Sequence, residues 1–240
     1  MGSGSTAKSR LLLDHLDSPA SFIPVDVACA QLAQSSAVLA NDYPGLEVTP
    51  VCADYTADFT LPDLTAPYLK TVILFLGSTI GNFEPDQAVE FLRQIVRFCG
   101  TGDSLLIGVD LKKDPEVLDR AYNDSQGVTA DFNLNLLARI RRELQARVDP
   151  SLFQHHAFYN DPAGRIEMHL VSRRPQSIVV GERDFPLAKD ESIVTEHSYK
   201  YSLKEFRQLA ARANLEVTHC WTDSDNWFSL QHLISSPRGR

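Results

Sequence analysis

Short apolar runs alternate with amphipathic helical segments over the first half of the chain, and this alternation limits the fold more than any other feature. The runs TVILFLGS (71–78) and DSLLIGVD (103–110) are typical of strands buried on both faces of a parallel sheet. Between them, PDQAVEFLRQIVRFCG (85–100) begins with proline and ends with glycine, as helices commonly do. Strands and helices in this order predict βαβ units, and therefore an α/β fold with a doubly wound sheet.

The pattern changes after about residue 114. Residues 114–148 have a helical pattern, and residues 153–172 predict a β-hairpin that turns at 161–164. A last helix at 202–214 leads into two β segments separated by TDSDN, which predict a second hairpin at the end of the chain. We therefore expect three parts: a nucleotide-binding core at 1–113, an inserted α+β substrate region at 114–198, and a closing helix and hairpin of the core at 199–240.

Charge and hydropathy exclude several classes of function. The formal net charge is −8, from 23 Lys and Arg against 31 Asp and Glu. It argues against a protein that coats nucleic acid, because neutralising phosphates needs clustered cations. No apolar run approaches the roughly 20 residues that span a bilayer, and no signal-peptide pattern opens the chain. We expect a cytoplasmic protein with neither a nucleic-acid nor a membrane partner.

The four cysteines are widely spaced and form no C-x-x-C pair: Cys29, Cys52, Cys99 and Cys220. In a reducing cytoplasm this spacing is typical of buried thiols rather than of a disulfide framework or a zinc site. The adjacent pair His155-His156 lacks the spacing of helical metal ligands, so we expect no metal.

A glycine-rich loop, GSGSTAKS (2–9), opens the chain with no strand before it. Gly2, Gly4 and Ala7 fit G-x-G-x-x-A, the turn by which a backbone approaches a nucleotide cofactor at a helix N-terminus. Residues 2–9 also fit G-x-x-x-x-A-K-S, which differs at one residue from the phosphate-loop motif of nucleoside triphosphatases. The composition is also typical of a flexible linker left by cloning. The loop alone leaves these three interpretations open.

Acidic residues follow the apolar runs at the positions where open parallel sheets bind their ligands. Asp26 lies 24 residues after Gly2, close to the spacing of an acid that binds ribose hydroxyls, but it is equally well placed to cap the next helix. Asp54 is suitably placed to accept a hydrogen bond from an adenine amino group, and Asp110 suits the magnesium ligand of a triphosphatase. The closing hairpin is similar to that of class I S-adenosylmethionine-dependent methyltransferases, which we favour over triphosphatases and NAD dehydrogenases.

The stretch FLGSTIGNFEPDQAVEFL (75–92) is more specific than a general strand exit. Taken alone, Gly77 and Gly81 ease a tight turn and Asn82 caps the helix. The stretch resembles the histidine-specific Nα-methyltransferase family of the ergothioneine pathway, whose members make the betaine of histidine. Six blocks resemble that family in order along nearly the whole chain: GSGSTAKSRLLL, FIPVDV, FLGSTIGNFEP, LLIGVDLKKDPEVLDRAYNDSQGVTADFNLNLLARIRREL, FYNDPAGRIEMHLVS and TEHSYKYS.

The resemblance implies a Rossmann-like class I methyltransferase fold, S-adenosylmethionine as cofactor, and methylation of the α-amine of L-histidine to the trimethyl betaine. It assigns the cofactor to Gly2, Gly4, Lys8, Asp26, Asp54 and Tyr55. It assigns the catalytic and substrate-binding positions to Asn82 and Tyr122, and the imidazole pocket to Met168, Glu196 and Ser198. Taken singly, Met168 also fits a strand core, Tyr122 a helix-end packing residue and Glu196 a surface strand position.

The chemistry agrees with these residue types. Methyl transfer from a sulfonium needs an amine lone pair that is positioned and desolvated, with no covalent nucleophile and no metal. Glu196 can accept a hydrogen bond from an imidazole N–H. Ser198, two residues on and therefore on the same strand face, can serve the other ring nitrogen.

The chain departs at its N-terminus from the family that it resembles. Family members carry several dozen residues before the glycine loop, and these include the first central strand of the sheet. Met1 stands where that strand should end, so we expect the strand to be missing and the activity to be impaired. The alternatives are a non-catalytic ligand-binding fragment and a triphosphatase built on the phosphate-loop motif.

Overall fold

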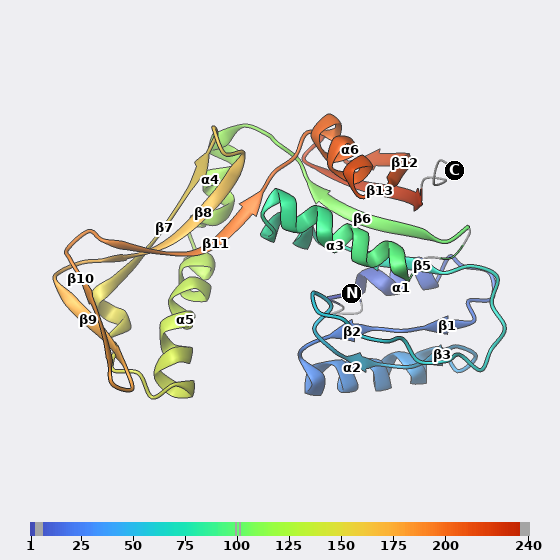
Figure 1. Ribbon diagram of the computed structural model, residues 1–240, viewed down its shortest axis with the longest axis horizontal. Coiled ribbons are helices and arrows are strands. Elements are labelled where there is room, and N and C mark those ends of the chain that lie inside the picture. The colour runs from blue at the N-terminus through green and yellow to red at the C-terminus, as the bar shows by residue number, and fades with distance from the viewer. Residues whose placement is uncertain (3–6, 99, 101, 236–240) are drawn as a thin grey trace.

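The computed structural model describes residues 1–2, 7–98, 100 and 102–235, and its centre is a four-stranded mixed sheet (Figure 1). The strands run in the order β12-β13-β6-β5. Strands β5 and β6 are parallel, and β13 is antiparallel to both of its neighbours. Their bounds are β5 (Val72–Phe75), β6 (Ser104–Asp110), β12 (Leu215–Thr222) and β13 (Phe228–Ser235). The parallel pair and the closing hairpin are confirmed.

Two helices, α3 (Pro85–Arg97) and α6 (Leu203–Arg212), contact each other and share one apolar core with the sheet. The core is continuous, with Phe75, Leu92, Ile107 and Phe206 fully enclosed. Full burial of large apolar side chains contributes about 1.5–3 kcal/mol each to folding. This core therefore holds the carboxyl ends of β5 and β6 in a fixed position.

The N-terminal strands pair separately from the four-stranded sheet. They form two short parallel pairs, β1 (Ser21–Phe22) with β3 (Glu47–Val48) and β2 (Val25–Asp26) with β4 (Val51–Cys52), accompanied by α1 (Ala7–Leu13) and α2 (Cys29–Asp42). Residues 1–2 connect the parts: the Met1 amino group donates to the Leu74 carbonyl at 2.8 Å, and the Gly2 N–H to the Val25 carbonyl at 2.9 Å. Among the described residues no strand pairs with the outer edge of β5, where the first central strand was expected.

A second sheet, in the order β11-β8-β7, lies beside the core and carries α4 and α5 (Figure 1). The predicted hairpin is confirmed, since β7 and β8 pair antiparallel around residues 161–164. The remaining elements are α4 (Pro115–Tyr122), α5 (Val128–Glu143), β7 (Phe153–Asn160), β8 (Arg165–Ser172), β9 (Gln176–Val180), β10 (Arg183–Leu187) and β11 (Ser192–Tyr199), with the 3₁₀ turns η1 (Thr79–Asn82) and η2 (Pro150–Leu152). Helices in the described ranges are all too short or too polar to cross a membrane.

Helix α5 differs in extent from the sequence prediction. It starts at Val128 because the Asp124 carboxylate accepts hydrogen bonds from the N–H groups of Val128 and Thr129, at 2.9 and 2.8 Å. It ends at Glu143, since Gln145 has a φ of 53°, which is not helical. Residues 144–148, predicted as helix, therefore lie outside it.

The prediction of buried thiols is wrong for two cysteines. Cys29 and Cys52 are exposed and form a disulfide, with their Cα atoms 5.2 Å apart. The cause is the register of the short parallel pair: Asp26 lies opposite Cys52, so the turn that begins α2 brings Cys29 beside it. Cys220 is a half-buried free thiol, and Cys99 lies outside the described residues.

Candidate functional site

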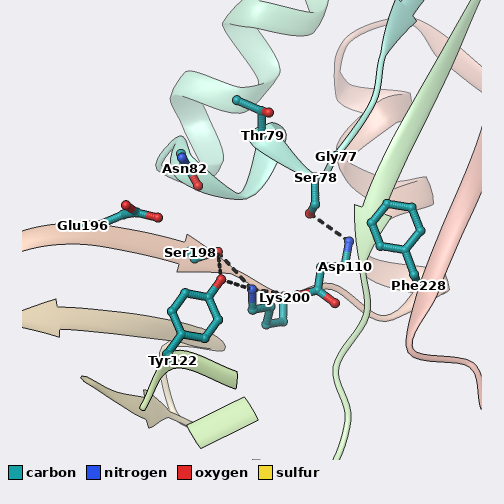
Figure 2. Close-up of a pocket in the computed structure, with 10 residues that line it drawn as sticks. All are labelled: Gly77, Ser78, Thr79, Asn82, Asp110, Tyr122, Glu196, Ser198, Lys200 and Phe228. Carbon is teal, nitrogen blue, oxygen red and sulfur yellow. Dashed lines mark hydrogen bonds and ion pairs between the residues drawn. The ribbon is translucent and has the colours of Figure 1, made fainter. Parts of the chain in front are cut away.

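A cavity of about 400 Å³ lies where the carboxyl ends of β5 and β6 meet the end of β11 and the end of α4 (Figure 2). Ligands of open α/β sheets bind outside the carboxyl ends of the strands. The residues that line it are Gly77, Ser78, Thr79, Asn82, Asp110, Tyr122, Glu196, Ser198, Lys200 and Phe228. The structure thus brings together four of the predicted substrate residues, Asn82, Tyr122, Glu196 and Ser198.

The turn after β5 forms one wall of the cavity. Ser78 has a φ of 62°, and its hydroxyl accepts a hydrogen bond from the Asp110 N–H at 2.8 Å, which ties the turn to β6. The interpretation of Asn82 as a helix cap is wrong. The N-cap of α3 is Glu84, whose own N–H donates to the Gln87 side chain at 3.2 Å. The Asn82 amide is exposed and lines the cavity instead (Figure 2).

A buried cation lies at the base of the cavity. Lys200 is 3% exposed, and its ammonium lies 2.8 Å from an Asp110 carboxylate oxygen. It also donates to the hydroxyls of Tyr122 and Ser198, both at 2.9 Å, and lies 4.9 Å from the centroid of the Tyr122 ring. Tyr122 in turn donates to Ser198 at 3.0 Å (Figure 2). These contacts fix the Tyr122 and Ser198 hydroxyls before any ligand binds.

Glu196 lines the cavity beside this cluster. An irregularity between Val194 and Glu196 shifts the register of β11 against β8, and after it Glu196 and Ser198 both line the cavity. Burial raises the pKa of the Glu196 carboxyl, and the positive charge of Lys200 opposes that rise. A partly desolvated carboxylate of this kind gains more from a ligand N–H than a fully solvated one.

Met168 does not line the cavity. It is 2% exposed and packs with Leu118, Ala157 and Ile166 in a small core against which Tyr122 rests. Its position supports the alternative that it is a strand core residue. A direct contact with imidazole stays a prediction.

A network around Glu84 joins α3 to β11. The Glu84 carboxylate lies 2.8 Å from His197 Nδ1 and 3.2 Å from the Arg165 guanidinium, and it accepts a short hydrogen bond from the Tyr199 hydroxyl. The Tyr199 hydrogen bond is the main cause of a lowered pKa at Glu84, which partial burial opposes. The backbone also approaches closely here, because a Cβ at Gly81 would lie 2.6 Å from the Tyr199 carbonyl oxygen. Both features hold β11 against the turn that carries Asn82.

The residues predicted to bind the cofactor gather at the carboxyl ends of β2 and β4. Gly2 has a φ of 61°, a region that favours glycine, and a Cβ there would lie 3.7 Å from the Tyr55 ring. Tyr55 is half-buried against Phe75, with ring centroids 5.7 Å apart. Burial raises the pKa of Tyr55, and the negative charges of Asp26 and Asp54 add to the rise. Gly2, Asp26, Asp54 and Tyr55 therefore lie around one place.

The two carboxylates are held by the backbone that follows them. Asp26 accepts from the Ala28 N–H at 3.0 Å, and Asp54 accepts from the N–H and hydroxyl of Thr56 at 2.8 and 2.6 Å. Asp26 is not the helix cap, because the N-cap of α2 is Ala28. The Thr56 hydrogen bonds lower the pKa of Asp54 and keep it ionised.

Of the two remaining residues predicted to bind the cofactor, the structure describes Lys8 but not Gly4. The Lys8 ammonium lies over the turn after β5, where a Cβ at Gly77 would be 3.2 Å from it. The Lys8 ammonium therefore lies beside a residue that lines the cavity. Gly4 lies outside the described residues.

Sequence analysis missed Lys200 and Phe228 as lining residues. A signal for Lys200 was present, since it lies two residues beyond Ser198 and alternation places both on one strand face. No local signal marks Phe228, which reaches the cavity only because β13 pairs with β6, where it lies opposite Asp110.

The chain is similar in sequence to proteins described as methyltransferases or as ergothioneine biosynthesis proteins. It is 39% identical over 240 residues to histidine N-alpha-methyltransferase of Mycolicibacterium smegmatis, a match that covers 98% of this chain and 74% of that protein. It is 31% identical to ergothioneine biosynthesis protein 1 of Neurospora crassa, covering 99% of this chain and 27% of that protein. It is also 31% identical to an L-tryptophan methyltransferase of Psilocybe serbica, over 70% of this chain and 48% of that one.

Solved structures share the fold at low sequence identity. An S-adenosylmethionine-dependent methyltransferase from Clostridium acetobutylicum superposes with a TM-score of 0.55 at 9% identity, covering 98% of this chain and 82% of that one. The PH0226 protein of Pyrococcus horikoshii superposes with a TM-score of 0.53 at 13% identity, covering 98% of this chain and 80% of that one. The family model described as "Histidine-specific methyltransferase, SAM-dependent" matches residues 1–235. Because that match spans nearly the whole chain, the protein belongs to the histidine-specific, S-adenosylmethionine-dependent methyltransferase family.

Proposed function

We propose that this chain transfers methyl groups from S-adenosylmethionine to the α-amine of L-histidine and carries the amine to the trimethyl betaine. The observation that carries the proposal is the cavity at the carboxyl ends of β5 and β6. There Glu196 and Ser198, on one strand, line the same cavity as Asn82 and Tyr122, which come from distant segments. An acceptor and a hydroxyl on one strand suit a ring with two nitrogens, and the other two suit the groups common to all amino acids.

The predicted cofactor site fits a nucleoside. The Gly2 turn lets the backbone approach closely, Asp26 and Asp54 offer fixed carboxylate acceptors for hydroxyl and amino groups, and Tyr55 offers a half-buried ring face. When bound, S-adenosylmethionine supplies a methyl group on a positively charged sulfur. Gly2, Asp26, Asp54 and Tyr55 would hold the adenosine of this cofactor.

The cavity residues bind and orient the amino acid. Glu196 accepts from one ring nitrogen, Ser198 serves the other, and the Asn82 amide and Tyr122 hydroxyl hold the backbone carboxylate and amine region. Catalysis then follows from position, because a held amine with its lone pair toward the methyl group needs no covalent or metal assistance from the protein. A site that hydrogen-bonds both ring nitrogens rejects other amino acids more strongly than an apolar pocket does.

The proposal extends to partners and location. We propose a cytoplasmic monomer that binds neither nucleic acid nor membranes. The net charge of −8 supports the absence of a nucleic-acid partner. Size-exclusion chromatography with light scattering tests the monomer.

Calorimetry and product analysis test the reaction. We expect binding of S-adenosylhomocysteine and, in its presence, of L-histidine. With S-adenosylmethionine, mass spectrometry should detect mono-, di- and trimethylated histidine. Asp26→Ala serves as a cofactor-site control and should abolish S-adenosylhomocysteine binding. Binding of ATP·Mg²⁺ without S-adenosylhomocysteine would support the triphosphatase alternative. Ligand binding without methylated product would support a non-catalytic fragment.

A further inference from the structure

Lys200 is a buried cation whose three N–H groups are all used within the protein. Its ammonium pairs with Asp110 at 2.8 Å and donates to the hydroxyls of Tyr122 and Ser198, both at 2.9 Å. An ammonium has three donors and no acceptor. Both hydroxyl oxygens are therefore held as acceptors, and Lys200 has no N–H left for a ligand.

The Ser198 oxygen receives a second hydrogen bond from Tyr122, at 3.0 Å. A phenol is a better hydrogen-bond donor than an alkyl hydroxyl, so Tyr122 donates and Ser198 accepts. A serine oxygen has two lone pairs, and Lys200 and Tyr122 occupy both. The Ser198 hydroxyl can then act toward a ligand only as a donor.

The two carboxylates near this cluster differ in whether they are paired within the protein. Asp110 is shared between Lys200 and Lys113, whose ammonium contacts its other oxygen at 2.5 Å. Glu196 lines the cavity, and within the described part of the chain its carboxylate makes no hydrogen bond or ion pair. The cavity thus presents one carboxylate acceptor and one hydroxyl donor from the same strand.

We propose that Lys200 is a positioning residue that sets substrate specificity: by occupying Ser198, it makes that hydroxyl an obligate donor, so that the cavity selects a ring nitrogen with a lone pair. The inference rests on the proposed function. A neutral imidazole has one N–H for Glu196 and one lone pair for Ser198. A pyrrole or indole ring has an N–H but no nitrogen lone pair, and an imidazolium has two N–H groups. With any of these three rings the Ser198 hydroxyl hydrogen finds no nitrogen lone pair: it faces either a carbon or another N–H.

The test measures selectivity between two kinds of ring by calorimetry in the presence of S-adenosylhomocysteine. The ligands are L-histidine and the β-(2-pyrrolyl)alanine and β-(3-pyrrolyl)alanine isomers, which between them place an N–H at either nitrogen position of imidazole. The selectivity is the Kd of the better pyrrolyl isomer divided by the Kd of histidine. Effects on the amino-acid backbone cancel in this ratio.

We expect Lys200→Met to lower the selectivity roughly three- to tenfold, because the freed lone pair lets Ser198 accept from an N–H. Tyr122→Phe frees the other lone pair and should lower the ratio in the same direction, which gives a second reading if Lys200→Met does not fold. In a Ser198→Ala background, Lys200→Met should leave the ratio unchanged.

Lys113→Met is the matched control, since it removes a cation from the same Asp110 carboxylate but contacts neither hydroxyl. It should keep the wild-type ratio. The inference would be overturned, and the proposed function kept, by either of two results. In one, Lys200→Met weakens the binding of all three ligands equally. In the other, Lys200→Met lowers the selectivity ratio as much in the Ser198→Ala background as in the wild-type protein. Absence of histidine binding to the wild-type protein would overturn the proposed function and, with it, this inference.

Discussion

Each polar side chain around the cavity has a different number of hydrogen-bonding positions left for a ligand once its protein contacts are counted. Lys200 has none left, and Ser198 keeps one donor. Glu196 keeps its whole carboxylate among the described residues, although it is partly buried. At the residue scale, therefore, Glu196 keeps its full acceptor capacity for a ligand, and the loss of its charge should weaken histidine binding strongly.

Glu196→Gln should weaken histidine binding about tenfold or more, because a buried hydrogen bond to a charged acceptor contributes about 1.5–3 kcal/mol. Burial raises the pKa of Glu196, so in the wild-type protein the carboxylate is lost at a higher pH than an ordinary carboxyl. Histidine binding should weaken as the pH falls through that raised pKa. The variant should lack this dependence.

The measurement is KM for histidine as a function of pH, expressed as the ratio of variant to wild type. The titration of the histidine ring itself is common to both proteins and cancels. Asn82→Ala is the control, since it should weaken all amino acids alike and keep the wild-type pH profile. Parallel profiles for Glu196→Gln and wild type would show that the charge of Glu196 does not bind the ring.

At the scale of elements, β11 connects the second sheet to the cavity. It pairs with β8 along its length, and beyond its end Lys200 and Tyr201 bond to the hairpin turn and to β6. The Glu84 network fixes this strand to the start of α3. The geometry of the imidazole side of the cavity therefore depends on a contact between two elements rather than on either element alone.

Glu84→Gln should lower the free energy of unfolding by about 1 kcal/mol at neutral pH, since Glu84 is half-exposed and its ion pairs are screened. The folded-state pKa of Glu84 is below its ordinary value of 4.5. Its charge therefore stabilises the protein above that value, and this contribution is lost as the pH falls through the lowered pKa. Urea unfolding from about pH 7 to about pH 3 should show the two proteins converge at the acid end.

Glu90→Gln is the matched control on the same helix, because Glu90 is exposed and pairs only with Arg93 among the described residues. It should change the free energy of unfolding little at any pH. If Glu84→Gln behaves like Glu90→Gln, the network does not hold β11 to α3.

The Cys29–Cys52 disulfide joins two other elements, the start of α2 and the end of β4. It closes a loop of 23 residues, for which chain entropy predicts a stabilisation of about 3 kcal/mol under oxidising conditions. Cys29→Ser should lower the melting temperature of the oxidised protein, and reductant should lower that of wild type to match. Cys220→Ser is the control and should do neither. Equal melting temperatures for Cys29→Ser and wild type without reductant would contradict the prediction.

At the scale of the whole molecule, the predicted cofactor site and the cavity belong to different parts of the structure. Asp26 and Asp54 follow the short parallel strands, and the cavity lies at the four-stranded sheet. Residues 1–2 and the Lys8 side chain, which lies over the turn after β5, connect them. A cofactor that contacts both parts should stabilise their relative position.

S-adenosylhomocysteine at about 100 times its Kd should therefore raise the melting temperature by about 5–10 °C, since mass action adds about 2.7 kcal/mol for a ligand that binds only the folded state. Differential scanning fluorimetry measures the shift. ATP·Mg²⁺ should produce none, and Asp26→Ala should remove the S-adenosylhomocysteine shift. An undiminished shift in Asp26→Ala would place the cofactor elsewhere.

Periodicity in the sequence determined the type and order of the main elements. Helices α3 and α6, strands β5 and β6 and both hairpins follow from apolar spacing and from Pro and Gly positions, because these signals act between near neighbours in the chain. The resemblance in ordered motifs determined the family, and it placed Asn82, Tyr122, Glu196 and Ser198 at what became one cavity.

Only the tertiary structure decided which distant side chains meet. Lys200 contacts a tyrosine 78 positions away, Cys29 pairs with Cys52 through the register of two strands, and Glu84 meets His197 across 113 positions. The separation of the N-terminal strands from the main sheet and the burial of Met168 belong to the same class. The physical reason is that local propensity sets the backbone of a segment, whereas contacts between segments depend on how whole elements pack and pair.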